Sequence, residues 1–453
     1  MIDTLVILGA SGDLTGRYLI PALARLAAVG QLSDSLRVLA VDRGAETDES
    51  FRATARERLA RHLPDLDQVH ADTVLERLSF RRADVTSAEQ LRTALPEVGE
   101  TRAAIYLALP NAVFQPALQA LSQLQLSPGS RLVVEKPFGV DEADARRLNQ
   151  AIGGCFAEDD VFRIDHFLAK QTVLDILGLR FANRIFELVW NSLHVERVEI
   201  VWDETLALEG RSGYYDHAGA LRDMVQNHLL QLLALLAMEP PTSLGARDLR
   251  DRKADVLRAV RPPSPDEMAS LARRGRYTAG RTESHDVPAY VEEEGVDPAR
   301  RTETYADVTL WVQNWRWAGV PFRLRTGKAL RRSRQEIALH FRPVAHQPFG
   351  EVAAPDVLRF SLDPDQIGLE INLNGAGDPF DLERATLRAG FAEQQLPPYS
   401  RLLAEILGGE PTLSIRGDEA EEGWRIIEPI LAAWDADEVP MKEYPAGSDG
   451  PGD

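Results

Sequence analysis

Residues 4–14 read TLVILGASGDL, an apolar run joined directly to a turn that contains two glycines. The run is apolar on both faces, which is typical of a buried parallel strand. Glycines at a strand-to-helix turn let the backbone approach a pyrophosphate, and the N-terminus of the following helix offers free N–H donors. The turn is not G-x-G-x-x-G, and a tight turn with Asp13 as an N-cap is the alternative. The position of this turn, directly after the first strand, favours a nucleotide-binding role for its residues Gly9, Ala10, Ser11, Gly12, Asp13 and Leu14.

Further apolar runs alternate with amphipathic helix patterns over the first third of the chain. Strands are predicted at 36–41, 103–109 and 132–134, and helices at 19–28 and 49–63. This alternation predicts an α/β fold, with a Rossmann-like, doubly wound dinucleotide-binding domain over residues 1–170.

The pattern changes after residue 170. Helices are predicted up to Trp190 and over 219–238, and an arginine- and aspartate-rich segment after Pro241 predicts a surface helix and loop. Strand-like runs then follow one another, at 195–202, 304–311, 320–325, 336–341, 357–362 and 367–373. Successive strands predict a larger α+β domain over 171–453, with a mostly antiparallel sheet, for substrate binding and oligomerisation.

The composition excludes several classes of protein. The chain has 453 residues, with 51 Lys and Arg against 70 Asp and Glu, so its formal charge is −19. That excess argues against nucleic acid as a partner. The most apolar long run, 229–238, is interrupted by Gln231 and reaches about half of the roughly 20 residues that a bilayer requires, so no membrane partner is expected. A single cysteine fits a reducing compartment, and a cytoplasmic location is expected.

The second predicted strand ends at Asp42 and Arg43. An acidic residue at this place accepts the ribose 2′-OH of NAD, whereas an arginine accommodates the 2′-phosphate of NADP. Both occur here side by side, and a charged loop after a strand remains the structural alternative.

Two other segments place cationic side chains where an anion would bind. Lys136 follows the strand at 132–134, although a lone lysine at a strand end is more often solvated. If a helix begins near Asp165, then His166 and Lys170 share one face near its N-terminus and form a phosphate site. The alternative is Asp165 as an N-cap beside two surface side chains.

Polar residues interrupt the otherwise apolar helix predicted over 219–238: Asp223, Gln226, Asn227 and His228. A histidine in this setting is usually a core residue with satisfied hydrogen bonds, but one that faces a cleft is suited to act as a general base. Further along, Arg325-Thr326-Gly327-Lys328 is rich in donors for an anion, and a solvated loop explains it equally well. No histidine spacing indicates a metal site.

Taken in order, these segments resemble the glucose-6-phosphate dehydrogenase family, from Leu5 to the Tyr444–Ser448 segment. The resemblance is carried by residues 9–14, 106–110, 135–139, 163–166, 179–183, 209–216 (including Arg211), 223–228 and 325–328. Any one of these could arise by chance, whereas the ordered set is highly specific.

The resemblance implies hydride transfer from C1 of glucose 6-phosphate to NADP, with NAD as a serious alternative because of Asp42. The product is 6-phosphogluconolactone, in the first step of the pentose phosphate pathway. It implies that His228 is the general base and that Asp165 orients its imidazole. The other implied roles are phosphate binding by His166 and Lys170, sugar binding by Glu204, Asp223 and Lys328, and alignment of substrate and nicotinamide by Lys136. A homodimer or homotetramer is implied as well.

The chain departs from the family pattern at several positions, among them Ala169 and Gln171 on either side of Lys170, and four others bear on the substrate and the cofactor. Phe167 replaces a tyrosine, Ser333 replaces a basic residue, Gly16 replaces a lysine of the nucleotide turn, and Asp42 stands where a neutral residue is usual. The first two leave open a related dehydrogenase for another sugar phosphate or a free sugar. A nucleotide-binding sensor without activity is the alternative from another class. The last two weaken the case for exclusive use of NADP.

Overall fold

The computed structural model describes residues 2–210, 212–282, 285–349, 353–378, 380–392 and 394–452, so Arg211 lies outside the described residues. The chain forms two compact units. The first comprises Met1–Lys170, Pro241–Arg250 and Gln394–Glu421, and the second comprises Gln171–Pro240, Asp251–Glu393 and Glu422–Asp453. The chain therefore returns twice to the first unit, through segments that the sequence analysis placed in the second domain.

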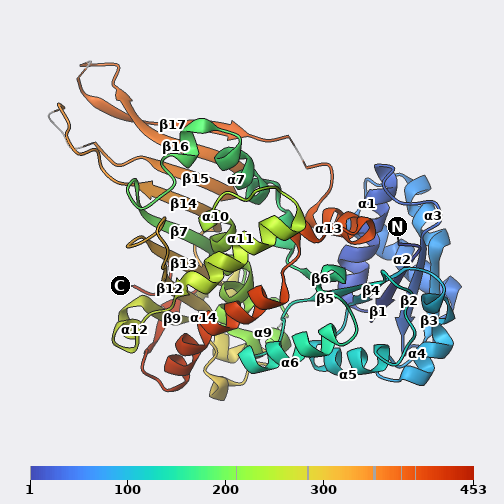
Figure 1. Ribbon diagram of the computed structural model, residues 1–453. Coiled ribbons are helices and arrows are strands. Elements are labelled where there is room, and N and C mark those ends of the chain that lie inside the picture. The colour runs from blue at the N-terminus through green and yellow to red at the C-terminus, as the bar shows by residue number, and fades with distance from the viewer. Residues whose placement is uncertain are drawn as a thin grey trace. The chain divides into compact units, whose positions relative to one another are not determined.

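The first unit is built on a six-stranded parallel sheet with the strand order β3-β2-β1-β4-β5-β6 (Figure 1). Its strands are β1 (Thr4–Leu8), β2 (Arg37–Asp42), β3 (Leu78–Arg82), β4 (Ala103–Leu107), β5 (Arg131–Glu135) and β6 (Val161–Ile164). The Rossmann-like prediction is confirmed, and the predicted strands are present. β3 and β6 were missed because both are short edge strands that carry arginines, which weakens the apolar signal.

Helices cover both faces of this sheet, with α1 packing against α2 and α3, and α5 packing against α4 and α6. They are α1 (Ile20–Ala28), α2 (Asp48–His62), α3 (Gln68–Arg77), α4 (Ala88–Ala94), α5 (Asn111–Leu121) and α6 (Glu142–Gly153). α1 is preceded by a π-helical segment, η1 (Thr15–Leu19), and α2 begins with a capping box formed by Thr47 and Ser50. A late helix, α13 (Pro398–Gly408), packs against α1 and completes the unit.

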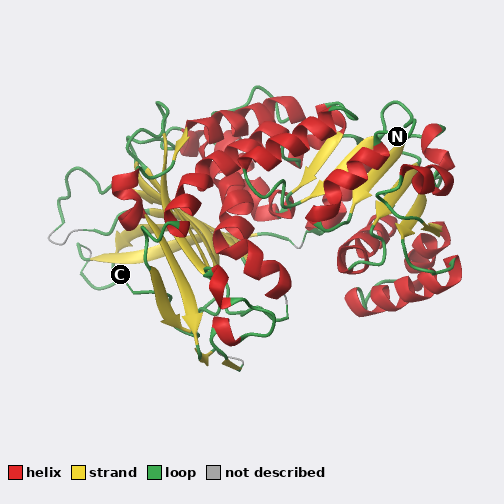
Figure 2. Cartoon of the chain, turned by 90° about the horizontal axis from the view of Figure 1, so that it is seen from below, coloured by secondary structure: helices red, strands yellow, loops and turns green. Residues whose placement is uncertain are grey.

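The second unit is built on a mixed sheet with the order β17-β16-β15-β14-β7-β13-β12-β9-β18, with the two-residue β8 (Val260–Arg261) beside β12. Its main strands are β7 (Val195–Asp203), β9 (Ala272–Thr278), β12 (Tyr305–Val312), β13 (Pro321–Gly327), β14 (Arg334–Phe341), β15 (Val357–Leu362), β16 (Asp365–Asn374), β17 (Leu382–Gly390) and β18 (Met441–Pro445). Among the described strands of this sheet, only β7 with β13 and β9 with β18 pair in parallel, so the mostly antiparallel prediction is confirmed. Figure 2 shows these strands in yellow.

The helices of the second unit differ from the predicted ones at two places. The helix predicted up to Trp190 is broken into α7 (Gln171–Phe181) and α8 (Arg184–Glu187). The segment over 219–238 contains a π-helix, η5 (Leu221–Leu229), followed by the fully buried α10 (Leu230–Ala237). α7 packs on β15 and β16, and η5 packs on β12 and β13. α9 (Ser212–Ala220) and α12 (Pro265–Leu271) lie in this unit, whereas α11 (Ala246–Ala259) and α14 (Gly417–Asp435) each continue from the first unit into the second.

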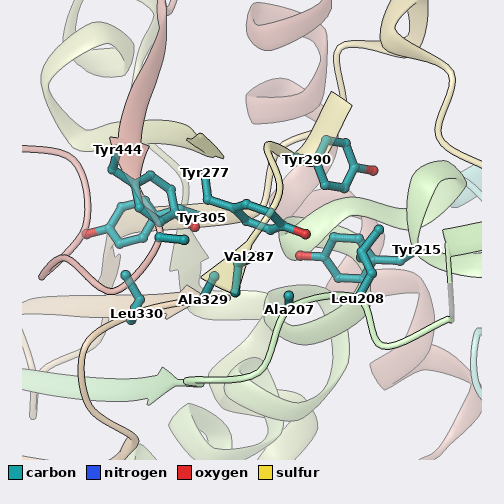
Figure 3. Packing of buried hydrophobic residues seen from close by; sticks show 11 residues of the cluster. Ala207, Leu208, Tyr215, Tyr277, Val287, Tyr290, Tyr305, Ala329, Leu330 and Tyr444 are labelled. Atoms are coloured by element: carbon teal, nitrogen blue, oxygen red, sulfur yellow. The ribbon is translucent and has the colours of Figure 1, made fainter. Parts of the chain in front are cut away.

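A cluster of buried tyrosines gathers around β9, β12 and β18 of this sheet (Figure 3). Tyr277 contacts Tyr290 and Tyr444 edge-on, with ring centroids 5.6 and 6.5 Å apart. Edge-to-face contacts of this kind stabilise aromatic cores beyond the burial of their area. Ala329 and Leu330, which follow Lys328, belong to the same cluster and anchor that segment.

Among the described residues, no helix combines the length and the apolar character needed to cross a membrane.

Candidate functional site

The glycine turn follows β1 at the point where the strand order of the first sheet reverses. Leu8 pairs with Val41 of β2 on one side and with Leu107 of β4 on the other. Crevices at such a switch point are where open α/β sheets bind their ligands. The turn that begins at Gly9 therefore emerges between the carboxyl ends of two strands.

Gly9 is required by its surroundings. Its φ is +89°, and a Cβ atom there would lie 2.3 Å from the carbonyl oxygen of Ala108. Its N–H donates to the carbonyl oxygen of Val41 over 2.9 Å. Asp13 is not the N-cap that the alternative required, because it already lies in the helical turn that leads into η1, and Gly12 before it has no side chain. A turn pressed onto two strand ends and followed by a helix without a side-chain cap suits an anionic ligand such as a pyrophosphate.

The carboxylate of Asp42 turns back toward the glycine turn. Its Oδ2 accepts a hydrogen bond from the backbone N–H of Ser11 over 3.0 Å, and its Oδ1 accepts one from the N–H of Arg43 over 2.7 Å. The side chain of Arg43 is exposed. The two neighbours therefore differ, because Asp42 is fixed on the turn and Arg43 extends into solvent.

Lys136 follows β5 at the same carboxyl edge of the sheet, next to Glu135. The Glu135 carboxylate accepts a hydrogen bond from the hydroxyl of Tyr106 over 2.6 Å. Burial raises the pKa of Glu135 to about 7, although the Tyr106 hydrogen bond and the charge of Lys136 both oppose this rise. The position of Lys136 at a strand end, predicted from the sequence, is the one that the structure shows.

The segment from Asp165 to Lys170 is a 3₁₀ turn, η4 (His166–Ala169), and not the start of an α-helix. Asp165 is buried and caps this turn, accepting the N–H of Phe167 over 2.9 Å. Lys170 has extended dihedral angles, and its Nζ lies 5.9 Å from the ring centroid of Phe167. The shared helical face proposed for His166 and Lys170 is therefore wrong. The two side chains flank one tight turn instead.

Tyr399 of α13 is a neighbour of His166 that sequence reasoning missed. The two rings stack with centroids 5.5 Å apart and planes at 18°, and Tyr399 also stacks on Tyr18 at 4.8 Å. No local pattern around Pro397-Pro398-Tyr399 indicates this contact, because it depends on α13 packing against η4. Tyr399 thus fixes the plane of the His166 imidazole.

In the second unit, Glu204 and Lys328 come together at the ends of two parallel strands. Asp203 pairs with Gly327, so the residues that follow β7 and β13 stand side by side. The Lys328 ammonium donates to Oε2 of Glu204 over 2.8 Å and lies 5.2 Å above the ring centroid of Tyr215. A carboxylate and an ammonium held in this way present complementary partners for sugar hydroxyls.

Asp223 and His228 both lie on η5. Residues five apart on an α-helix are rotated by about 140°, whereas the wider π-helix bonds i to i+5 and brings such residues toward one face. Asp223 accepts a hydrogen bond from the hydroxyl of Tyr214 over 3.3 Å. His228 is buried, and its backbone N–H donates to Oδ1 of Asn227 over 2.6 Å. The π-helical geometry was not predicted, since the sequence indicated an ordinary helix.

Comparison with known proteins gives matches to two family models that together span almost the whole chain. Residues 6–175 match the NAD binding domain of glucose-6-phosphate dehydrogenase, and residues 177–453 match its C-terminal domain.

Individual relatives agree with these models. The glucose-6-phosphate 1-dehydrogenase of Mycolicibacterium smegmatis is 41% identical, over 99% of this chain and 94% of its own length. That of Gluconobacter oxydans is 40% identical, over 98% of this chain and 94% of its own length. A structure of glucose-6-phosphate dehydrogenase in complex with glucose-6-phosphate covers 99% of this chain and 96% of its own, with 31% identity and a TM-score of 0.91. The Mycobacterium avium enzyme has a TM-score of 0.87 at 34% identity and covers 100% of this chain and 96% of its own.

Proposed function

The chain belongs to the glucose-6-phosphate dehydrogenase family, and we propose from this membership how its own residues carry out the family's reaction. It is a glucose-6-phosphate 1-dehydrogenase, which oxidises C1 of glucose 6-phosphate to 6-phosphogluconolactone, the first step of the pentose phosphate pathway. The observation that carries this function is the full-length match to relatives of that activity at about 40% identity. C1 loses a hydride and its hydroxyl loses a proton, so the protein must supply a hydride-acceptor site and a base.

The first unit fits a nicotinamide dinucleotide, which when bound supplies the hydride acceptor. The close approach at Gly9 and the absence of a side-chain cap on η1 are suited to its pyrophosphate. We assign the contacts with this group to residues 9–14 and to the end of β2, and the alignment of substrate and nicotinamide to Lys136.

We assign the proton transfer to His228, whose imidazole takes the proton of the C1 hydroxyl. Its buried setting on η5 supports this role, because a base must be held within hydrogen-bond reach of the proton it removes. Asp165 is the proposed partner that orients the imidazole and stabilises its cation. Phosphate binding is assigned to His166, held by Tyr399, and to Lys170.

We assign the binding of the sugar hydroxyls to Glu204, Lys328 and Asp223. The Glu204–Lys328 pair supports this assignment, since the half-buried ends of two parallel strands hold donor and acceptor together. Phe167 offers no hydroxyl to the substrate, so the phosphate rests on fewer hydrogen bonds than the family pattern provides.

Initial rates of cofactor reduction with glucose 6-phosphate and with free glucose test this function. We expect turnover of the phosphate ester with a kcat/KM far above that for glucose, because His166 and Lys170 have nothing to bind in the free sugar. A protein that binds the dinucleotide but oxidises no phosphorylated hexose would refute the assignment. A panel of other sugar phosphates decides whether Phe167 and Ser333 have changed the preferred substrate.

We also propose that the protein forms a homo-oligomer through the sheet of the second unit. β17 is largely exposed, and Leu373 of β16 and Leu387 of β17 are half exposed. Large apolar side chains on an exposed sheet are typical of a surface that is covered in the assembled protein.

A further inference from the structure

The end of β2 and the loop that follows it place two carboxylates on the glycine turn, and both are hydrogen-bonded to the same serine. Asp42 accepts the backbone N–H of Ser11 over 3.0 Å. The hydroxyl of Ser11 donates to Oε2 of Glu46 over 3.1 Å. Both donors of Ser11, which a bound anion would otherwise use, are thus engaged by negatively charged groups of the protein.

Arg58 of α2 holds the turn in this arrangement from its carbonyl side. Its Nη1 donates to the carbonyl oxygen of Gly12 and its Nη2 to that of Ser11, each over 3.1 Å. The side chain fits there because position 16 is glycine: a Cβ atom at Gly16 would lie 2.2 Å from Cδ of Arg58. The guanidinium therefore binds carbonyl groups in the place where the resemblance leads one to expect a lysine side chain.

Arg43 is the cation that the sequence offers to a 2′-phosphate, and the structure weakens that role. Its backbone N–H donates to Asp42, while its side chain is exposed. A phosphate that reached Arg43 would approach the Asp42 carboxylate in the adjoining residue, and two like charges at such a distance repel each other. A ribose hydroxyl, by contrast, donates a hydrogen bond to a carboxylate at this point.

We propose that Asp42 and Glu46 make the adenosine-ribose site of this enzyme selective for NAD over NADP. The inference rests on the proposed function, which requires that a dinucleotide binds here. It specifies further that the site disfavours a dinucleotide with a 2′-phosphate. Asp42 accepts the hydrogen bond of the ribose 2′-hydroxyl. Glu46 accepts the hydrogen bond of the Ser11 hydroxyl, so this hydroxyl is not available to a 2′-phosphate. Arg58 is a positioning residue that keeps the turn, and with it Ser11, in place.

Binding to the whole protein, measured without sugar, tests the proposal directly. Titrations followed by the fluorescence of NADH and NADPH at one ionic strength should give a Kd at least tenfold lower for NADH, a difference of about 1.4 kcal/mol. Competition of NADH by AMP and by adenosine 2′,5′-bisphosphate, which differ only in the 2′-phosphate, repeats the comparison on the adenosine end alone, and AMP should bind more tightly. Equal or tighter binding of NADPH and of adenosine 2′,5′-bisphosphate would overturn the proposal.

Variants assign the preference to these residues. The double variant Asp42→Asn with Glu46→Gln should tighten NADPH binding about tenfold and weaken NADH binding. Glu76→Gln removes one exposed charge from α3 of the same unit and should leave the ratio of the two Kd values as in the parent. An unchanged ratio in a folded double variant would show that other residues set the choice. If NADH binds selectively but glucose 6-phosphate is not oxidised, the proposed function fails while this inference stands.

Discussion

Lys328 and Glu204 form an ion pair of 2.8 Å between the residues that directly follow two parallel strands of the second unit. Removal of either side chain would leave the other as an unpaired charge in a half-buried position. Replacement of Lys328 by Met should therefore raise KM for glucose 6-phosphate by about 10- to 100-fold, the loss expected for one charged hydrogen bond. Steady-state kinetics check this. Lys442→Met on β18, which removes a lysine whose ammonium contacts only the Gly452 carbonyl among described residues, is the control. A KM equal to the parent's would remove Lys328 from the sugar site.

His228→Asn should lower kcat by about 10²- to 10⁴-fold, the usual contribution of a general base. The amide keeps a polar side chain of similar size, so binding of glucose 6-phosphate should change little. Calorimetric titration of the variant with the sugar phosphate measures binding separately from turnover. A kcat within threefold of the parent would show that another group accepts the proton.

Tyr399→Leu should raise KM for glucose 6-phosphate more than Tyr399→Phe does. The phenylalanine preserves the ring that stacks on His166, whereas the leucine frees the imidazole to rotate away from the phosphate. Both variants are compared by KM and kcat with glucose 6-phosphate. Equal effects would mean that the hydroxyl, and not the stack, is what the site uses.

The Glu135 carboxyl makes stability depend on pH. Its ordinary pKa is 4.5, and burial raises the pKa to about 7 in the folded protein. The folded state therefore keeps a proton that the unfolded state releases between these values. The corresponding stability is fully present below pH 4.5 and is lost as the pH rises through 7, amounting to at most about 3 kcal/mol.

Glu135→Gln removes this titration while it keeps an acceptor for the Tyr106 hydroxyl. The variant should gain stability relative to the parent at pH 8 and gain little at pH 5, as measured by denaturant unfolding at both values. A difference that does not change with pH would contradict the raised pKa.

Leu387→Glu should convert the native oligomer to a smaller species, because a charge on β17 cannot be buried between sheets without a partner. Light scattering coupled to gel filtration gives the mass. Leu244→Glu places the same charge on another exposed leucine, in the first unit, and should leave the mass unchanged. An unchanged mass for Leu387→Glu would exclude this surface as the interface.

The two sheets were predictable because buried strands leave continuous apolar runs, as in residues 4–8 and 195–202. The placement of residues 9–14 and Lys136 directly after strands was predictable for a related reason, since a strand end is visible in the sequence. Tyr399 and Arg58 were not, because each reaches its partner through the packing of a separate helix. The π-helical form of η5 was also hidden, since the apolar spacing around His228 is compatible with an ordinary helix.

The return of the chain to the first unit at residues 394–421 constrains how the protein is made. Arg131 on β5 donates to the carbonyl oxygens of Ile406 and Leu407 in α13, and Glu158 accepts the N–H of Gly417. On the ribosome, the Rossmann-like sheet can form early, but it must wait for almost the entire polypeptide before these hydrogen bonds close. A gene fragment that ends after the sheet would encode a fold with α1 uncovered, so this dinucleotide-binding unit is poorly suited to exchange as an independent cassette.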